Sequence, residues 1–266
     1  MATQINNIIT DGVEMEYFRF GNGERTIAII PGLSIKSVMA SADVIVRTFS
    51  LFSKEFTVYV FDRRKNLPDE YSIEDMADDQ CKVFDALGIK DVALYAISQG
   101  GMIALQMSLA RPDLVSAMVL GSTCSRINEL GKDTIVEWNC LAKKGNEALL
   151  IDSFGRKVFT ASFYERFADI IRGAFKGISE EEFKRLAILT DKIEMFDVYD
   201  RLVEIKCPVF VMGGDQDMIF GVEAFKEIAE ELNCEIYVFE GFGHAVYDET
   251  PEFKEKALEF FKKSLI

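Results

Sequence analysis

Residue types that together perform nucleophilic catalysis occur in this sequence, each just after a short apolar run. Ser98 follows the run Val92–Ile97 and lies between small residues in the pattern small-x-Ser-x-Gly. This pattern is typical of a strained strand-to-helix turn, where bulky neighbours would collide with the crossing backbone and the serine hydroxyl projects into a cleft. A serine beside two glycines can also be an ordinary loop residue or helix cap, so Ser98 alone does not establish chemistry.

A serine hydroxyl is a weak nucleophile and needs a general base. The chain contains one histidine, His244, which lies among glycines in the segment 241–245, after the run Glu235–Phe239. An isolated histidine is often a surface or core residue with no catalytic role. Its position after a strand-like run, however, predicts a loop at the same end of a sheet as Ser98. We therefore interpret His244 as the base that serves Ser98.

The base in turn needs a carboxylate that orients its ring. The run 209–212 ends in two glycines, which are followed by Asp215 and Asp217. An acid in such a loop can approach His244 from the side, and position alone leaves both aspartates open. The remaining carboxylates of the chain are interpreted as solvated or ion-paired surface groups.

The elements that must position these residues alternate along the chain between short β-rich runs and amphipathic helical patterns. Runs that are apolar on both faces predict central strands of a mostly parallel sheet with helices on each side. The predicted strands are Val13–Phe20, 26–30, Phe56–Phe61, Val92–Ile97, 117–120, 209–212 and Glu235–Phe239. The predicted helices are one that begins after a capping signal at Ser72 and ends at Gly88, and others over 101–110, Val222–Leu232 and 251–265.

The segment 122–205 differs from the rest because strand-like runs disappear and long helical patterns replace them. One of these patterns begins clearly at Ser179. Phenylalanines recur through the segment, and we expect them to pack beneath the helices rather than to line a ligand site. The sequence thus predicts one α/β core made of residues 1–121 and 206–266, with a helical insertion over one end of its sheet.

The composition excludes several classes of function. Thirty Lys and Arg against 44 Asp and Glu give a net charge of −14, so we expect neither nucleic-acid nor membrane-surface binding. No apolar stretch approaches the ~18 residues of a membrane span, and the first residues show no secretory signal. Five widely spaced cysteines and one histidine argue against a disulfide framework and against a zinc site. We expect a cytoplasmic protein with reduced thiols, no metal and no cofactor.

The order Ser, Asp, His, each after a successive strand, resembles the α/β-hydrolase superfamily, and the likeness covers nearly the whole chain. The segment 208–217 is similar to the pattern of the superfamily's acid strand, which is Pro, four apolar positions and x-Gly-x-x-Asp. That register selects Asp217 over Asp215. The segment 243–251 matches the superfamily's Gly-His-x₄-Glu-x-Pro.

Two further loops are similar to motifs of the superfamily but differ from them at some positions. Residues 30–33 are similar to the superfamily's oxyanion loop, with Pro31 in place of the usual histidine. The resemblance implies that the backbone N–H groups of Leu33 and Gln99 form the oxyanion hole. Residues 62–67 resemble the superfamily's Asp-x-Arg-Gly-x-Gly, but lysine and leucine replace its two glycines, so we expect this loop to differ in shape.

The resemblance implies an α/β-hydrolase fold in which 122–205 is a lid inserted after the sixth strand. It also implies a serine hydrolase that acts on a small or medium-sized ester, lactone or related carbonyl substrate. In that chemistry His244 takes the Ser98 proton, Asp217 orients the imidazole, and an acyl-enzyme forms. Two alternatives remain open: a non-catalytic small-ligand-binding protein on the same scaffold, and an acyltransferase. The expected partner is a small-molecule substrate, and the sequence does not predict the oligomeric state.

Overall fold

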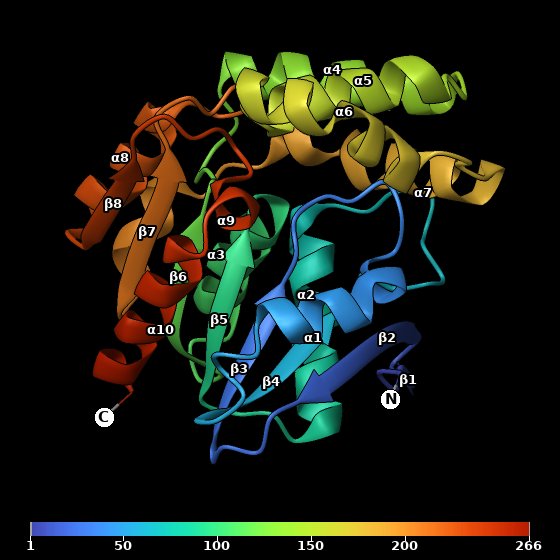
Figure 1. Ribbon diagram of the computed structural model, residues 1–266. Helices are drawn as coiled ribbons and strands as arrows, with labels where there is room; N and C mark the ends of the chain where they lie inside the picture. Colours follow the sequence, from blue (N-terminus) through green and yellow to red (C-terminus); the bar gives the residue numbers. More distant parts are fainter. Residues whose placement is uncertain (1, 266) are drawn as a thin grey trace.

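The runs that are apolar on both faces form the centre of one eight-stranded sheet (Figure 1). The structure is a computed structural model that describes residues 2–265. Across the sheet the order is β1-β2-β4-β3-β5-β6-β7-β8; β2 is antiparallel to both neighbours, and every pair from β4 to β8 is parallel. The strands are β1 (Asn6–Thr10), β2 (Val13–Phe20), β3 (Arg25–Ile30), β4 (Phe56–Phe61), β5 (Val92–Ile97), β6 (Val115–Gly121), β7 (Val209–Gly214) and β8 (Glu235–Phe239).

Helices cover both faces of this sheet, as the both-sided apolar strands require. The α-helices are α1 (Ala42–Thr48), α2 (Ile73–Leu87), α3 (Gln99–Ala110), α4 (Glu129–Lys143), α5 (Glu147–Val158), α6 (Ala161–Phe175), α7 (Glu180–Asp191), α8 (Val222–Leu232), α9 (Val246–Glu249) and α10 (Glu252–Ser264). The 3₁₀ helices are η1 (Val38–Ser41), η2 (Ile193–Met195) and η3 (Tyr199–Glu204).

Alternate residues of β5 belong to two separate buried clusters, because successive side chains of a strand point to opposite faces. Leu94 packs in the cluster that contains buried residues of α2, α3 and α8. Its neighbour Tyr95 packs in the cluster that contains residues of α1 and α10. The predicted fold class, a mostly parallel sheet between helices, is confirmed.

Most predicted elements are found within a residue or two of their expected bounds. The capping signal at Ser72 is confirmed, because its side chain accepts from the backbone N–H of Asp75 while the Asp75 side chain accepts from the backbone N–H of Ser72. The helix ends at Gly88, whose φ of 68° suits glycine. Strand β1, the helices α1 and α9 and the 3₁₀ helix η1 were not predicted. Helix α3 begins at Gln99, two residues before its predicted start.

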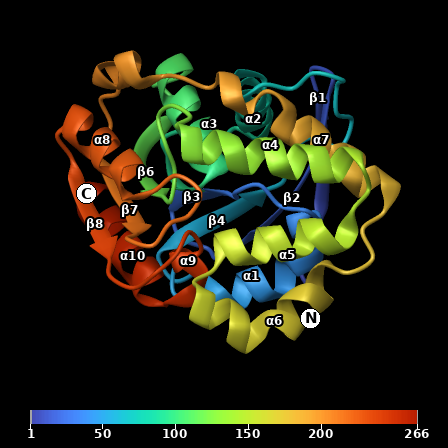
Figure 2. The same cartoon turned by 90° about the horizontal axis from the view of Figure 1, so that it is seen from above.

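Helices α4–α7 lie across the end of the sheet where β5 and β6 finish (Figures 1 and 2). Helix α7 begins with a second capping box, made by Ser179 and Glu182. Buried side chains of this layer, among them Trp138 and Leu186, join the core cluster that contains residues of α2, α3 and α8. Over the described part of the chain, no helix combines the length and the apolarity that a bilayer crossing demands.

Candidate active site

The turn between β5 and α3 holds Ser98 in a strained backbone conformation. Its φ is 52° and its ψ is −121°, a region that costs a non-glycine residue about 1–3 kcal/mol. The neighbouring chain is too close for a larger residue at position 100, because a Cβ on Gly100 would lie 2.0 Å from the carbonyl oxygen of Ile30. The small residue predicted two positions after Ser98 is therefore required by the crossing backbone.

The loop after β3 lies directly against Ser98. A Cβ on Gly32 would be 3.1 Å from the Ser98 Cβ and 3.7 Å from its Oγ. Within residues 2–265, the backbone N–H groups of Leu33 and Gln99 donate no hydrogen bond. Gln99 is the first residue of α3, where backbone N–H groups lack intrahelical acceptors and favour negative charge. Two free donors therefore lie on the two segments that meet at the serine.

Asp217 and His244 form a buried pair beyond β7 and β8. His244 Nδ1 lies 2.7 Å from Asp217 Oδ2, and the two side chains are only 3% and 0% exposed. The second carboxylate oxygen, Oδ1, accepts from the backbone N–H groups of Ile219 at 2.7 Å and Phe220 at 2.9 Å. With the carboxylate ionised, Nδ1 is the donor of the pair, and His244 Nε2 is left as an acceptor.

The structure does not join every predicted site residue directly. Asp215 lies apart from the imidazole, because its Oδ1 accepts from the backbone N–H of Gly241 at 2.7 Å. Within the described residues, no hydrogen bond links the Ser98 hydroxyl to His244. Such contacts are often long in ligand-free sites and tighten when substrate binds. In the same part of the chain, no group of three His, Cys, Asp or Glu side chains is arranged to hold a metal ion.

The loop that carries His244 is bonded to the helical layer above it. The backbone N–H of Ala245 donates to the Val158 carbonyl at 2.8 Å, at the end of α5. Two residues further along the layer, the Thr160 hydroxyl donates to Glu249 at 2.9 Å. Partial burial raises the pKa of Glu249. These contacts, which no sequence motif indicates, fix the histidine loop against the segment between α5 and α6.

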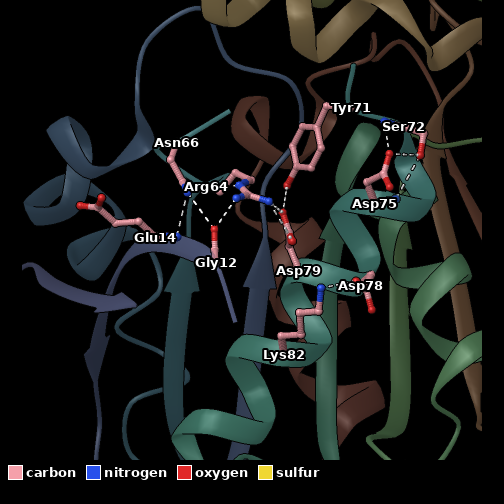
Figure 3. Close-up of polar contacts among 10 residues, drawn as sticks. All are labelled: Gly12, Glu14, Arg64, Asn66, Tyr71, Ser72, Asp75, Asp78, Asp79 and Lys82. Carbon is pink, nitrogen blue, oxygen red and sulfur yellow. Dashed lines mark hydrogen bonds and ion pairs between the residues drawn. The ribbon is translucent and has the colours of Figure 1, made fainter. Parts of the chain in front are cut away.

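The loop after β4, where the two expected glycines are missing, carries two adjacent arginines that contact different parts of the chain. Arg64 Nη1 lies 3.3 Å from both carboxylate oxygens of Asp79, and Arg64 Nη2 donates to the Gly12 carbonyl (Figure 3). Tyr71 donates to the same aspartate at 2.7 Å, and burial raises the pKa of its phenol. Arg63 points inward and is 6% exposed. Sequence reasoning missed Arg63, although it lies inside the motif that departs from the superfamily pattern.

Comparison with known proteins agrees with this fold. The family model described as the α/β hydrolase fold matches residues 30–143. MGS-M2, an α/β hydrolase enzyme from a Medee basin deep-sea metagenome library, superposes with a TM-score of 0.87 over 97% of both chains, at 23% identity. Both comparisons identify the fold of this chain as that of the α/β hydrolases.

The chain is also similar to curated proteins along most of its length. It is 28% identical to a Rhizobium rhizogenes protein named "Putative carbamate hydrolase RutD", over 78% of this chain and 83% of the relative. It is 26% identical to the mouse protein named "Serine hydrolase BPHL", over 79% of this chain and 69% of the relative. Both names describe hydrolases.

Proposed function

We propose that this α/β hydrolase cleaves a small or medium-sized ester, lactone or related carbonyl compound through an acyl-enzyme on Ser98. The observation that carries the proposal is the buried hydrogen bond between Asp217 and His244. A buried carboxylate–imidazole pair, with Nε2 free to accept, is what activation of a serine hydroxyl requires. The strained turn at Ser98, after a strand of the same parallel sheet, supplies that hydroxyl.

In the first half of the reaction, Ser98 Oγ attacks the carbonyl carbon and its proton passes to His244 Nε2. The carbonyl π electrons move to oxygen, and the backbone N–H groups of Leu33 and Gln99 stabilise the resulting oxyanion. Removal of one such donor typically lowers the rate by ~10²–10³. The tetrahedral intermediate then expels the alkoxide, which takes the proton from His244, and an ester remains on Ser98.

In the second half, water attacks the ester carbonyl while His244 Nε2 accepts its proton. Collapse of the second intermediate returns this proton to Ser98 Oγ and releases the acid. Asp217 accepts from Nδ1 throughout, so it holds the ring in one tautomer and stabilises the imidazolium.

We assign the segment 122–205 as the lid of this site, inserted into a core of residues 1–121 and 206–266. Contacts from the insertion to the proposed catalytic loops support the assignment. Val158 accepts from the backbone of Ala245, next to His244, and the Leu189 carbonyl accepts from the Gln99 side chain at 2.8 Å. The lid therefore contacts both the histidine loop and the serine turn, and its position is suited to shape the substrate pocket.

Turnover of a defined substrate panel tests the proposed function. The panel contains p-nitrophenyl esters of increasing acyl length, a simple lactone and an aryl carbamate; the carbamate is included because one relative is named for that activity. We expect turnover of at least one member by the native chain and a loss of at least ~10³ in kcat for Ser98→Ala. Equal turnover by the native chain and Ser98→Ala would contradict the proposal.

The same panel separates the two alternatives. Absence of turnover, together with tight binding of a small ligand, would favour a ligand-binding protein on this scaffold. If an added alcohol or amine captured the acyl group in preference to water, the enzyme would be an acyltransferase that uses the same residues. Product analysis with and without such an acceptor therefore accompanies the assay.

A further inference from the structure

One buried side chain contacts both segments that carry the proposed oxyanion donors. Arg63 Nη2 donates to the Pro31 carbonyl at 2.7 Å and to Gln99 Oε1 at 3.1 Å. The Pro31 carbonyl belongs to the peptide unit that precedes the Gly32–Leu33 peptide, which carries the Leu33 N–H. Gln99 supplies the second N–H from its own backbone. A single guanidinium nitrogen therefore bridges the loop after β3 and the first residue of α3.

The guanidinium stays charged in this buried position. Desolvation lowers the pKa of Arg63 to about 10, which still leaves it protonated at neutral pH, and the adjacent Asp62 opposes the decrease. Asp62 also accepts from the backbone N–H of Arg63 at 2.8 Å and from Arg185 Nη2 of α7 at 2.6 Å. Arg185 Nη1 donates to the Ser34 carbonyl at 3.1 Å, so the loop after β3 is held from a second direction.

Burial of Arg63 has a free-energy cost that stability alone does not explain. Its Nε is buried and has no hydrogen-bond partner within residues 2–265. A buried donor without a partner costs about 1–3 kcal/mol, and a charged group costs more. An apolar side chain of similar volume would avoid that cost. The hydrogen bonds from Arg63 to Pro31 and Gln99 therefore point to a role in positioning these two segments.

We propose that Arg63 is a positioning residue of the oxyanion hole, which holds the Leu33 and Gln99 N–H groups at the separation that an oxyanion requires. The inference rests on the proposed function, since it assigns a role within that reaction. Arg63 touches no reacting atom; it acts through the Pro31 peptide and the Gln99 side chain. Misplacement of a catalytic group by about 1 Å can cost ~10² in rate.

Arg63→Met tests this role, with Arg64→Met as the matched control. The two arginines are adjacent and each donates to one backbone carbonyl, but Arg64 binds the Gly12 carbonyl and the side chains of Asn66 and Asp79 (Figure 3), none of which belongs to the serine turn. With the best ester of the panel, we expect Arg63→Met to lower kcat ~10–100-fold with KM changed less than about threefold. The affinity for a trifluoromethyl ketone, whose adduct carries an oxyanion, should fall by a similar factor. Arg64→Met should lower the melting temperature and leave kcat within about twofold.

Arg63→Lys keeps the inference testable if Arg63→Met does not fold. Lysine retains the charge but holds Pro31 and Gln99 less rigidly than the planar guanidinium, so kcat should fall to an intermediate value. The inference would be overturned if the Arg63 variants had the same kcat as the native chain, or if the Arg63 and Arg64 variants lost equal amounts of kcat. In both cases, Ser98-dependent turnover by the native chain would still support the proposed function. A native chain whose turnover does not depend on Ser98 would overturn both.

Discussion

His244 Nδ1 lies 2.7 Å from Asp217 Oδ2 in a position where neither side chain is more than 3% exposed. Removal of water strengthens the interaction between an imidazolium and a carboxylate, because the local dielectric response is weaker than that of bulk water. Two backbone N–H groups, those of Ile219 and Phe220, hold the other carboxylate oxygen. The pair is therefore pre-oriented before substrate arrives.

Asp217→Asn should lower kcat by ~10³–10⁴, because the amide no longer fixes the histidine tautomer or stabilises the imidazolium. Steady-state kinetics on the best ester will measure the loss. Asp215→Asn is the matched control, since Asp215 lies two residues away and its side chain, within residues 2–265, accepts only from the Gly241 N–H. Similar kcat values for the two variants would show that the Asp217–His244 contact does not contribute to turnover.

Gly100→Ala should destabilise the fold by about 3 kcal/mol or more, because the new Cβ would lie 2.0 Å from the backbone carbonyl oxygen of the buried residue Ile30. Gly173→Ala is the control within a helix. Among the described residues, a Cβ at Gly173 would meet no atom within 4 Å beyond its own stretch of α6, and alanine should stabilise α6 by about 0.5–1 kcal/mol. Urea denaturation of both variants gives the two free energies of unfolding. An unchanged free energy of unfolding for Gly100→Ala would contradict the close approach of the Ile30 carbonyl to Gly100.

Thiol reagents should leave activity intact. Burial raises the pKa of Cys81 to about 12 and that of Cys124 well above its usual value, so at pH 8 only about one Cys81 thiol in 10⁴ is the reactive thiolate. Cys140 is exposed. Peptide mapping after brief iodoacetamide treatment should find Cys140 modified, Cys81 and Cys124 protected, and ester turnover unchanged. Rapid inactivation that follows alkylation would indicate a cysteine in the site.

Asp152 should stabilise the contact between α5 and α6 in a pH-dependent manner. Hydrogen bonds from Arg156 and Arg172 lower the pKa of this carboxyl to about 2. Since the folded-state pKa lies below the usual value of 3.8, the stabilisation is complete above that value and is lost as pH falls toward about 2. Asp152→Asn should therefore reduce stability at pH 7, and the difference from the native chain should shrink between pH 4 and pH 2.5.

The control for Asp152 is Asp169→Asn on α6, because the Asp169 side chain makes no ion pair or hydrogen bond within the described residues. Denaturant titrations of the native chain and both variants across the pH range provide the comparison. A pH-independent effect of Asp152→Asn would mean that packing, rather than charge, accounts for the loss.

The sheet and the serine turn were predictable because local rules decide them. Strands that are apolar on both faces are typical of a sheet covered by helices on both sides. The small residues around Ser98 are required because larger side chains would collide with the backbone that crosses the tight turn. Helix α1 was not predictable in the same way. Its β-branched residues disfavour a helix by propensity, and packing of buried Ala42 in the core cluster beside α10 overrides that preference.

The contacts that complete the site depend on tertiary structure that one sequence does not reveal. The direction of Arg63 is set by where Pro31 and Gln99 come together, which requires the parallel arrangement of β3, β4 and β5. The bond from Ala245 to Val158 joins segments that are 87 positions apart and carries no side-chain signature. Backbone contacts of this kind become visible only in the folded chain.

Labelling with a fluorophosphonate tests the central claim most directly, because this reagent forms a stable phosphonyl ester with an activated serine. Intact-mass measurement and peptide mapping should show one adduct per native chain, located on Ser98. Ser98→Ala should show none under the same conditions, and His244→Gln should label much more slowly. An adduct that persists in Ser98→Ala, or that maps to another residue of the native chain, would contradict the account.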